Sequence, residues 1–124
     1  MAIDSEKLGS ILKDFVTSTN YVEGVVLVSP DGLPLASLLP RGMDEERTSA
    51  LSAAILSLSE RIGVELSRGT IERLYIEGSN GYGILTGCGE DAVLLVLASK
   101  PVKPGILMLE IKRAVTEIKT VLTL

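Results

Sequence analysis

The sequence predicts an α/β sandwich in which helices cover both faces of a five-stranded antiparallel sheet. Three segments show helical periodicity, five short apolar segments are typical of strands, and the turns between several of those strands are short enough for hairpins. The predicted element order is α-β-β-α-β-β-β-α, within a single domain that spans residues 1–124. The most apolar strands belong at the centre, which gives the sheet order 2-1-5-4-3.

The first third of the chain predicts a helix followed by a β-hairpin. Asp4 is a suitable N-cap, and apolar residues then recur at helical spacing over residues 8–16. Residues 22–28 are almost all apolar and predict a central strand. A turn at residues 29–32 leads to a strand over residues 33–39, and Pro34 places that strand at an edge because it has no amide to donate.

A long helix is predicted from Met43 to about Ser67, with Gly69 ending it. The acidic residues at positions 44–46 suit the first turn of a helix, where the helix dipole favours negative charge. Four large apolar residues lie within a narrow arc of the helical wheel, and we expect them to contact the core: Leu51, Ile55, Leu58 and Ile62.

The last part of the chain predicts three strands and a final helix. The strands cover residues 70–77, 82–88 and 91–99, with short connections typical of hairpins. Residues 70–77 carry charges at alternate positions, which favours a strand toward the edge of the sheet. Residues 92–97 are apolar on both faces and predict a central strand. After Gly105, apolar residues return to helical spacing.

The composition argues against most enzyme chemistry. The chain has no histidine and one cysteine, Cys88, which excludes imidazole-based catalysis and an internal disulfide. The net charge of −4 and an aromatic content of 3% argue against a nucleic-acid partner, which favours basic surfaces and stacking rings. We expect a protein with no catalytic residue, no cofactor and no metal. Without a signal peptide or a membrane-spanning run, we also expect a cytoplasmic location and no membrane insertion.

Two local motifs could suggest chemistry, and both have a structural interpretation. Residues 81–87 read GxGxxxG, but a strand follows them, so no helix N-terminus is available to bind a phosphate. Cys88 lies between two glycines, and no base is available to activate its thiol, so we interpret it as a packing residue.

The long helix has two further sides beside its apolar stripe. One side has small residues at spacings of four, Ala50 with Ala54 and Ala53 with Ser57, which would allow another backbone to approach closely. The other side is mostly polar and carries one leucine, Leu56. A helix with three distinct sides suggests more than one partner.

Residues 22–37, with their strand, Ser-Pro-Asp-Gly turn and returning strand, resemble the first hairpin of the roadblock/dynein light chain family. The alanine-rich helix at residues 50–69, the segment at residues 89–97 and the glycine that opens the last helix resemble later parts of the same family. The resemblance implies a homodimer or heterodimer in which the third strands pair antiparallel into a ten-stranded sheet, with the long helices side by side. It also implies binding and regulation of a Ras-like small GTPase, or scaffolding, and it carries over no catalytic residue.

Two candidate surfaces follow from this resemblance and from the faces of the long helix. Leu56 is the expected anchor for the GTPase, and the alternatives are an ordinary exposed leucine or packing on the partner helix. Arg41, Arg47 and Arg61 lie in or near the helix, so a role for an arginine in hydrolysis stays open. The expected dimer interface consists of Ala50, Ala53, Ala54, Ser57, Arg61, Thr70, Glu72, Arg73, Leu74 and Tyr75, and the expected GTPase-binding face of Glu46, Ser49, Ser52, Leu56, Ser59, Glu60 and Gly63.

The alternative function is a small-ligand sensor built on a similar sandwich, akin to PAS or GAF modules. Such a sensor needs a roomy pocket lined by aromatic residues and a few polar groups. The chain has only four aromatic residues, and its aliphatic residues suffice to fill a core. The sensor is therefore the second hypothesis.

Overall fold

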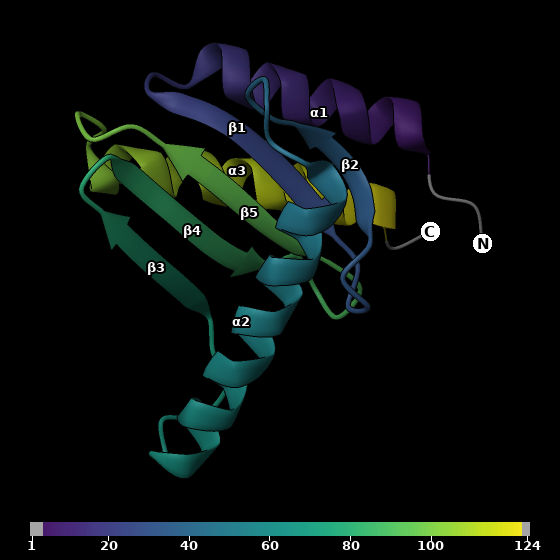
Figure 1. Ribbon diagram of the computed structural model, residues 1–124. Helices are drawn as coiled ribbons and strands as arrows, with labels where there is room; N and C mark the ends of the chain where they lie inside the picture. Colours follow the sequence, from purple (N-terminus) through teal and green to yellow (C-terminus); the bar gives the residue numbers. More distant parts are fainter. Residues whose placement is uncertain (1–3, 123–124) are drawn as a thin grey trace.

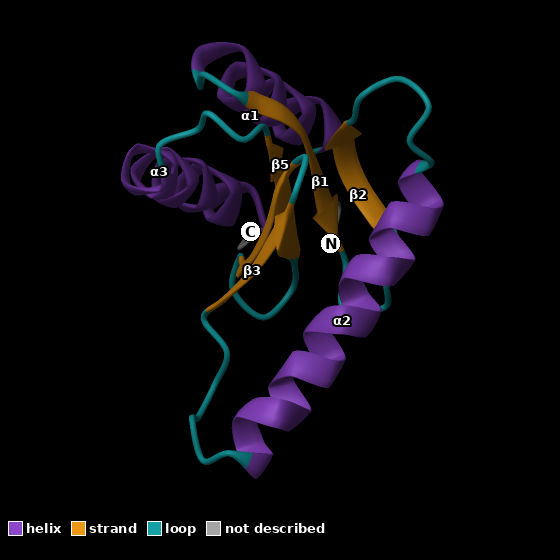
Figure 2. Cartoon of the chain, turned by 60° about the vertical axis from the view of Figure 1, so that its left-hand side comes forward, coloured by secondary structure: helices purple, strands orange, loops and turns teal. Residues whose placement is uncertain are grey.

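The computed structural model describes residues 4–122 and shows three helices and five strands in the predicted order (Figure 1). The strands form one antiparallel sheet in the order β2-β1-β5-β4-β3, which confirms the predicted topology. Helices α1 and α3 cover one face of the sheet, and α2 crosses the other (Figure 2). The elements are α1 (Ser5–Ser18), β1 (Val22–Val28), β2 (Pro34–Leu38), α2 (Glu45–Glu65), β3 (Arg73–Gly78), β4 (Gly81–Gly87), β5 (Val93–Ala98) and α3 (Pro104–Leu122).

The main core lies between the sheet and the pair α1 and α3. Because successive residues of a strand point to opposite faces, Val25 and Leu27 of β1 face α1 and α3, while Val26 and Val28 belong to a smaller cluster on the α2 face. Both helices bury an apolar side in the main core. Their fully buried residues include Leu8, Leu12, Leu107, Ile111 and Ile118.

Local signals in the sequence set the helix starts. The Asp4 carboxylate accepts a hydrogen bond of 3.0 Å from the amide of Lys7, which confirms the predicted cap of α1. The Asp44 carboxylate accepts a bond of 2.9 Å from the amide of Glu46. Asp44 is therefore the N-cap of α2, and the helix begins at Glu45 rather than at the predicted Met43.

The two edges of the sheet are the predicted ones, but the third strand is shorter than expected. β2 begins at Pro34 and pairs only with β1 within the described residues. β3 begins at Arg73 rather than at Thr70, and residues 70–72 belong to the connection from α2. This connection has to return from the end of α2, which extends beyond the ends of the strands (Figure 1), before pairing with β4 can begin.

Helix α2 is rotated about its axis relative to the prediction, and the expectation that its leucine stripe contacts the core is wrong. Ser49, Ser52 and Ser59 are the buried residues, at 0%, 5% and 9% exposure, whereas Leu51 and Leu58 are 63% and 60% exposed. Small side chains let the helix lie close to β1 and β2, which it contacts.

Hydrogen bonds within α2 make this burial of serines possible. The hydroxyls of Ser49 and Ser52 each donate to the carbonyl four residues earlier, at 2.8 Å. A buried hydroxyl with a partner avoids most of the desolvation penalty that an unpaired one would have. At the C-terminal end, Gly63 is buried as well, and a Cβ there would lie 2.8 Å from the carbonyl oxygen of Gly69.

The corrected orientation changes the effect expected for Leu56→Asp. Leu56 is half-buried and faces the sheet side of α2, so a carboxylate there would be partly desolvated. We expect the variant to lose about 2–4 kcal/mol of unfolding free energy in denaturant titrations. Leu66→Asp, at a residue 60% exposed, is the control and should lose less than about 0.5 kcal/mol. Equal stability of the two variants would contradict this orientation.

Candidate functional site: an apolar face between helix α2 and the sheet

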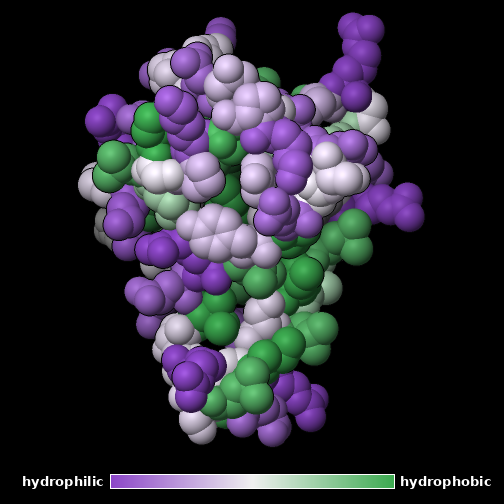
Figure 3. Space-filling view, turned by 90° about the vertical axis from the view of Figure 1, so that its left-hand side faces the viewer, coloured by the Kyte–Doolittle hydropathy of each residue, from purple (hydrophilic) through white to green (hydrophobic). Residues whose placement is uncertain are grey.

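The exposed side of α2 carries a continuous apolar stripe. It consists of Leu51, Ile55, Leu58 and Ile62, at spacings of four, three and four residues, with exposures of 63%, 37%, 60% and 48%. Residues at these spacings lie on one side of a helix. Figure 3 shows hydrophobic side chains gathered on the lower half of the molecule, where α2 extends beyond the sheet. We call these four residues the α2 stripe.

A groove separates the α2 stripe from the sheet. It has a volume of about 940 Å³, and its walls are mainly apolar. Leu51, Ile55 and Leu58 line it from the helix, and Leu85, Leu95 and Leu97 line it from the strands. Leu85 and Leu95 belong to the small core cluster on this face, which α2 therefore covers only in part. The groove and the stripe together form an apolar surface that has no cover among the described residues.

The free edge of the sheet adjoins the groove. β3 pairs with β4 on one side and with no other strand among residues 4–122. Tyr75 and Ile76 are 49% and 43% exposed, and Ile76 also lines the groove. An edge strand presents unpaired amides and carbonyls to solvent. This region therefore combines two features that favour association with another chain.

The structure separates the residues predicted for the dimer interface. Ala54 lines the groove, but Ala50, Ser57 and Arg61 are exposed on other sides of α2. Ala53 is half-buried beside a second cavity. Leu74 faces the α2 side of the sheet, and Arg73 and Tyr75, its neighbours in β3, point to the opposite face. Thr70 and Glu72 lie before the strand and line the second cavity.

The predicted GTPase-binding face does not exist as one exposed surface. Ser49, Ser52, Ser59 and Gly63 are buried within the protomer, and Gly63 lies against Gly69 and Ile71 in the connection from α2 to β3. Leu56 is half-buried and lines a cavity of about 470 Å³ together with Glu60. Of this predicted face, only Glu46 and Glu60 are exposed.

Sequence reasoning found the residues of the α2 stripe but assigned them to the core of the protomer. One signal was available: the serines and Gly63 recur at the same helical spacing as the leucines, which marks a second stripe able to approach a sheet closely. Periodicity alone does not decide which of two stripes faces the sheet.

The described residues show no arrangement for metal or nucleophilic chemistry. Cys88 is buried in the core, as interpreted, and desolvation raises the pKa of its thiol to about 12, although nearby Lys119 acts in the opposite direction. The thiol is therefore protonated at neutral pH and unreactive. Within residues 4–122, no group of histidine, cysteine or acidic side chains could hold a metal ion, and no helix is long and apolar enough to cross a membrane.

Comparisons with known proteins agree with this architecture. The model of the Roadblock/LC7 domain family matches residues 9–98. Two uncharacterized proteins from Methanocaldococcus jannaschii are 35% identical over 104 residues, which is 84% of this chain and 90% of each relative.

Solved structures show the same fold at lower sequence identity. MglB from Myxococcus xanthus superimposes with a TM-score of 0.89 at 19% identity, over 99% of this chain and 92% of that one. A structure described as MglB with tetrameric arrangement gives a TM-score of 0.86 at 17% identity, over 94% of this chain and 88% of that one. The fold, the family model and the relatives agree, and the chain belongs to the Roadblock/LC7 domain family.

Proposed function

We propose that this chain forms a two-fold dimer that serves as a non-catalytic interaction module and binds and regulates a Ras-like small GTPase. The observation that carries the proposal is the exposed α2 stripe beside the free edge of β3. Large exposed apolar surfaces on a small domain usually mark an interface. Membership of the Roadblock/LC7 family supports a role in protein interaction.

A second copy of the chain is the occupant that best fits this surface. In a two-fold interface the same patch is used by both subunits, so it has to complement itself. An antiparallel edge strand can pair with its own copy, and an apolar helix stripe can pack on its own copy. Pairing of β3 with its copy would join two five-stranded sheets into one of ten strands and bring the two α2 helices together over it.

The dimer would leave another side of α2 free for the GTPase. Ala50, Ser57 and Arg61 are exposed and lie well round the helix from the α2 stripe, at about 100° per residue. Small side chains make this side smooth, and an arginine can stabilise charge during phosphoryl transfer. We therefore propose Arg61 and its small neighbours, with exposed Glu46, as the GTPase-binding face in place of the buried serines.

Leu58→Glu tests the dimer. We expect the wild-type chain to have twice the 13.2 kDa chain mass in sedimentation equilibrium. The two-fold axis would place the substitution twice in an apolar interface, so the dissociation constant should rise by about two orders of magnitude or more. Circular dichroism should show a folded variant, because Leu58 is 60% exposed in the protomer.

Val64→Glu is the matched control for the dimer test. Val64 lies on the same helix and is 75% exposed, but it faces away from the α2 stripe. This variant should dimerise like the wild type. A wild-type chain that stays monomeric at high micromolar concentration would contradict the dimer, as would equal effects of the two glutamates.

Ser57→Arg tests the GTPase-binding face. A large side chain on the smooth side of α2 should weaken GTPase binding by about tenfold and leave the dimer mass unchanged. The measurement is the release of fluorescent GDP from Ras-like GTPases encoded in the same genome, titrated with the protein. Lys13→Glu, on α1 at the opposite face of the sheet, is the control and should behave like the wild type.

Two results would contradict the GTPase proposal. One is that none of the Ras-like GTPases responds to the wild-type protein in nucleotide release or hydrolysis. The other is that Ser57→Arg and Lys13→Glu respond equally. A small molecule that copurifies in the groove and saturates it would favour the ligand sensor instead.

A further inference from the structure

A cavity between the end of α1 and the start of α3 contains a buried hydroxyl group that has no hydrogen-bond partner within residues 4–122. The hydroxyl belongs to Thr19, which lines the cavity and is 8% exposed. Leaving a buried hydroxyl unpaired costs free energy, so such groups are rare in native proteins. The cavity has a volume of about 570 Å³, which leaves room for a partner. We propose that it binds a small carboxylic acid in its ionised form, with the Thr19 hydroxyl as one of the donors.

Hydrogen bonds fix the backbone on both sides of Thr19. Its own amide donates to the Phe15 carbonyl at 3.1 Å, at the point where α1 ends. Tyr21, which also lines the cavity, has a φ angle of 70°, in the left-handed region that aromatic residues rarely adopt. The Tyr21 carbonyl accepts hydrogen bonds from the amide and the hydroxyl of Ser99, at 2.8 and 3.2 Å. The wall of the cavity that contains Thr19 is therefore anchored to α1 and to the end of β5.

The start of α3 forms another wall of the cavity and has free backbone amides. Lys103 precedes the helix, and its side chain has no acceptor atom that could cap it. Pro104 has no amide hydrogen, and the amide of Leu107 donates to the Lys103 carbonyl at 3.0 Å. The amides of Gly105 and Ile106 have no partner among the described residues. Free amides at a helix N-terminus carry partial positive charge, so they favour a negatively charged group nearby.

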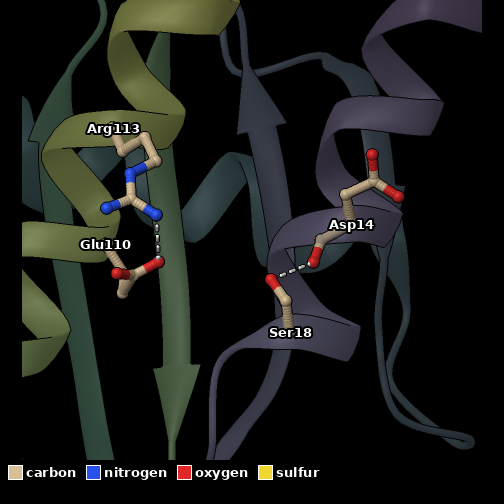
Figure 4. A network of polar contacts seen from close by, with 4 residues as sticks. All are labelled: Asp14, Ser18, Glu110 and Arg113. Carbon is tan, nitrogen blue, oxygen red and sulfur yellow. Dashed lines mark hydrogen bonds and ion pairs between the residues drawn. The ribbon is translucent and has the colours of Figure 1, made fainter.

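The charged residues that line the cavity have a net positive charge. They are Lys103, Glu110 and Arg113, so two cations accompany one anion. Figure 4 shows Arg113 paired with Glu110 on α3, at 3.5 Å. Across from this ion pair, the Ser18 hydroxyl donates to the Asp14 carbonyl within α1, and Asp14 lines the neighbouring groove rather than this cavity. Lys103 has no ion pair within the described part of the chain, so its charge is available to a ligand.

The polar groups of the cavity that lack a partner match an ionised carboxylate. The Thr19 hydroxyl, the Asn20 side-chain amide and the Lys103 ammonium can each donate a hydrogen bond. The two oxygens of a carboxylate only accept, and hydrogen bonds to a charged acceptor are stronger than neutral ones. The single charge of a carboxylate matches the one unpaired cation of the cavity. A phosphate monoester carries nearly two negative charges at neutral pH, so its charge would be matched only in part.

Apolar side chains provide a surface for the body of the acid. Val102 and Leu107 are buried in the wall of the cavity, and Tyr21 and Ile106 line it with about half of their surface exposed. An apolar lining with a few polar groups that fix orientation is typical of small-molecule sites. The site lies on the face of the sheet opposite α2 (Figure 2), so it does not depend on the dimer or on the GTPase-binding face.

The test is an NMR titration with three carboxylates of different size, which are acetate, hexanoate and phenylacetate. Amide resonances of residues 18–21 and 102–107 should shift with at least one of them, and the neutral amide of that acid should bind about tenfold more weakly or worse. Thr19→Val should weaken binding of the acid by about tenfold, because valine has nearly the same shape without the donor. The melting temperature of this variant should not fall, because the hydroxyl has no partner to lose. Lys103→Gln should weaken binding to a similar extent.

Two variants serve as matched controls for the titration. Thr17→Val makes the same substitution at an exposed residue of α1 whose hydroxyl already donates to the Lys13 carbonyl, at 2.8 Å. Lys7→Gln removes a cation at the other end of α1. Both controls should bind the acid like the wild type. Absence of a shift with all three acids at tens of millimolar would overturn the proposal. Equal binding by Thr19→Val and Thr17→Val, or by Lys103→Gln and Lys7→Gln, would overturn it as well.

Discussion

The close approach of α2 to the sheet is the constraint on which the rest of the surface depends. Ser49 and Ser52 are buried on the side of α2 that faces the sheet, and side chains this small allow backbone elements to pack tightly. Once that side faces the sheet, the helical period forces the leucines and isoleucines of the α2 stripe to face outward. The apolar face is therefore exposed because the stripe of α2 that has small side chains packs against the sheet, which leaves the stripe with large apolar side chains on the outside.

The strands and their order could be predicted because short-range signals determine them. Three signals limit the pairing of neighbouring strands to the observed arrangement. They are the Ser-Pro-Asp-Gly turn, the short connections, and the segments 25–28 and 92–97, which are apolar on both faces. Pro34 marks one edge strand, and the charged β3 marks the other. These signals act over a few residues and do not depend on the rest of the fold.

The orientation of α2 could not be predicted in the same way. The helix has a leucine stripe and a serine stripe with the same period, and the usual rule places large apolar side chains inside. That rule applies to the assembled molecule and not to a single protomer. If a second copy covers the α2 stripe, as we propose, the leucines are core residues of a dimer. The sequence of one chain contains no signal that distinguishes the two cases.

The two faces of the sheet therefore differ in character. The face under α1 and α3 is closed, with fully buried residues such as Leu12, Leu94 and Ile118. The face under α2 is only partly covered and leaves a groove of about 940 Å³. Under our proposed function, the open face serves association between chains.

The most direct test of the central claim is amide hydrogen exchange along β3, measured by NMR at two protein concentrations. The amides of β3 that point away from β4 have no strand partner within the described chain. If β3 pairs with its own copy, these amides should be protected at high concentration and should exchange faster on dilution. Rapid exchange at every concentration, with normal protection in β4 and β5, would contradict the account.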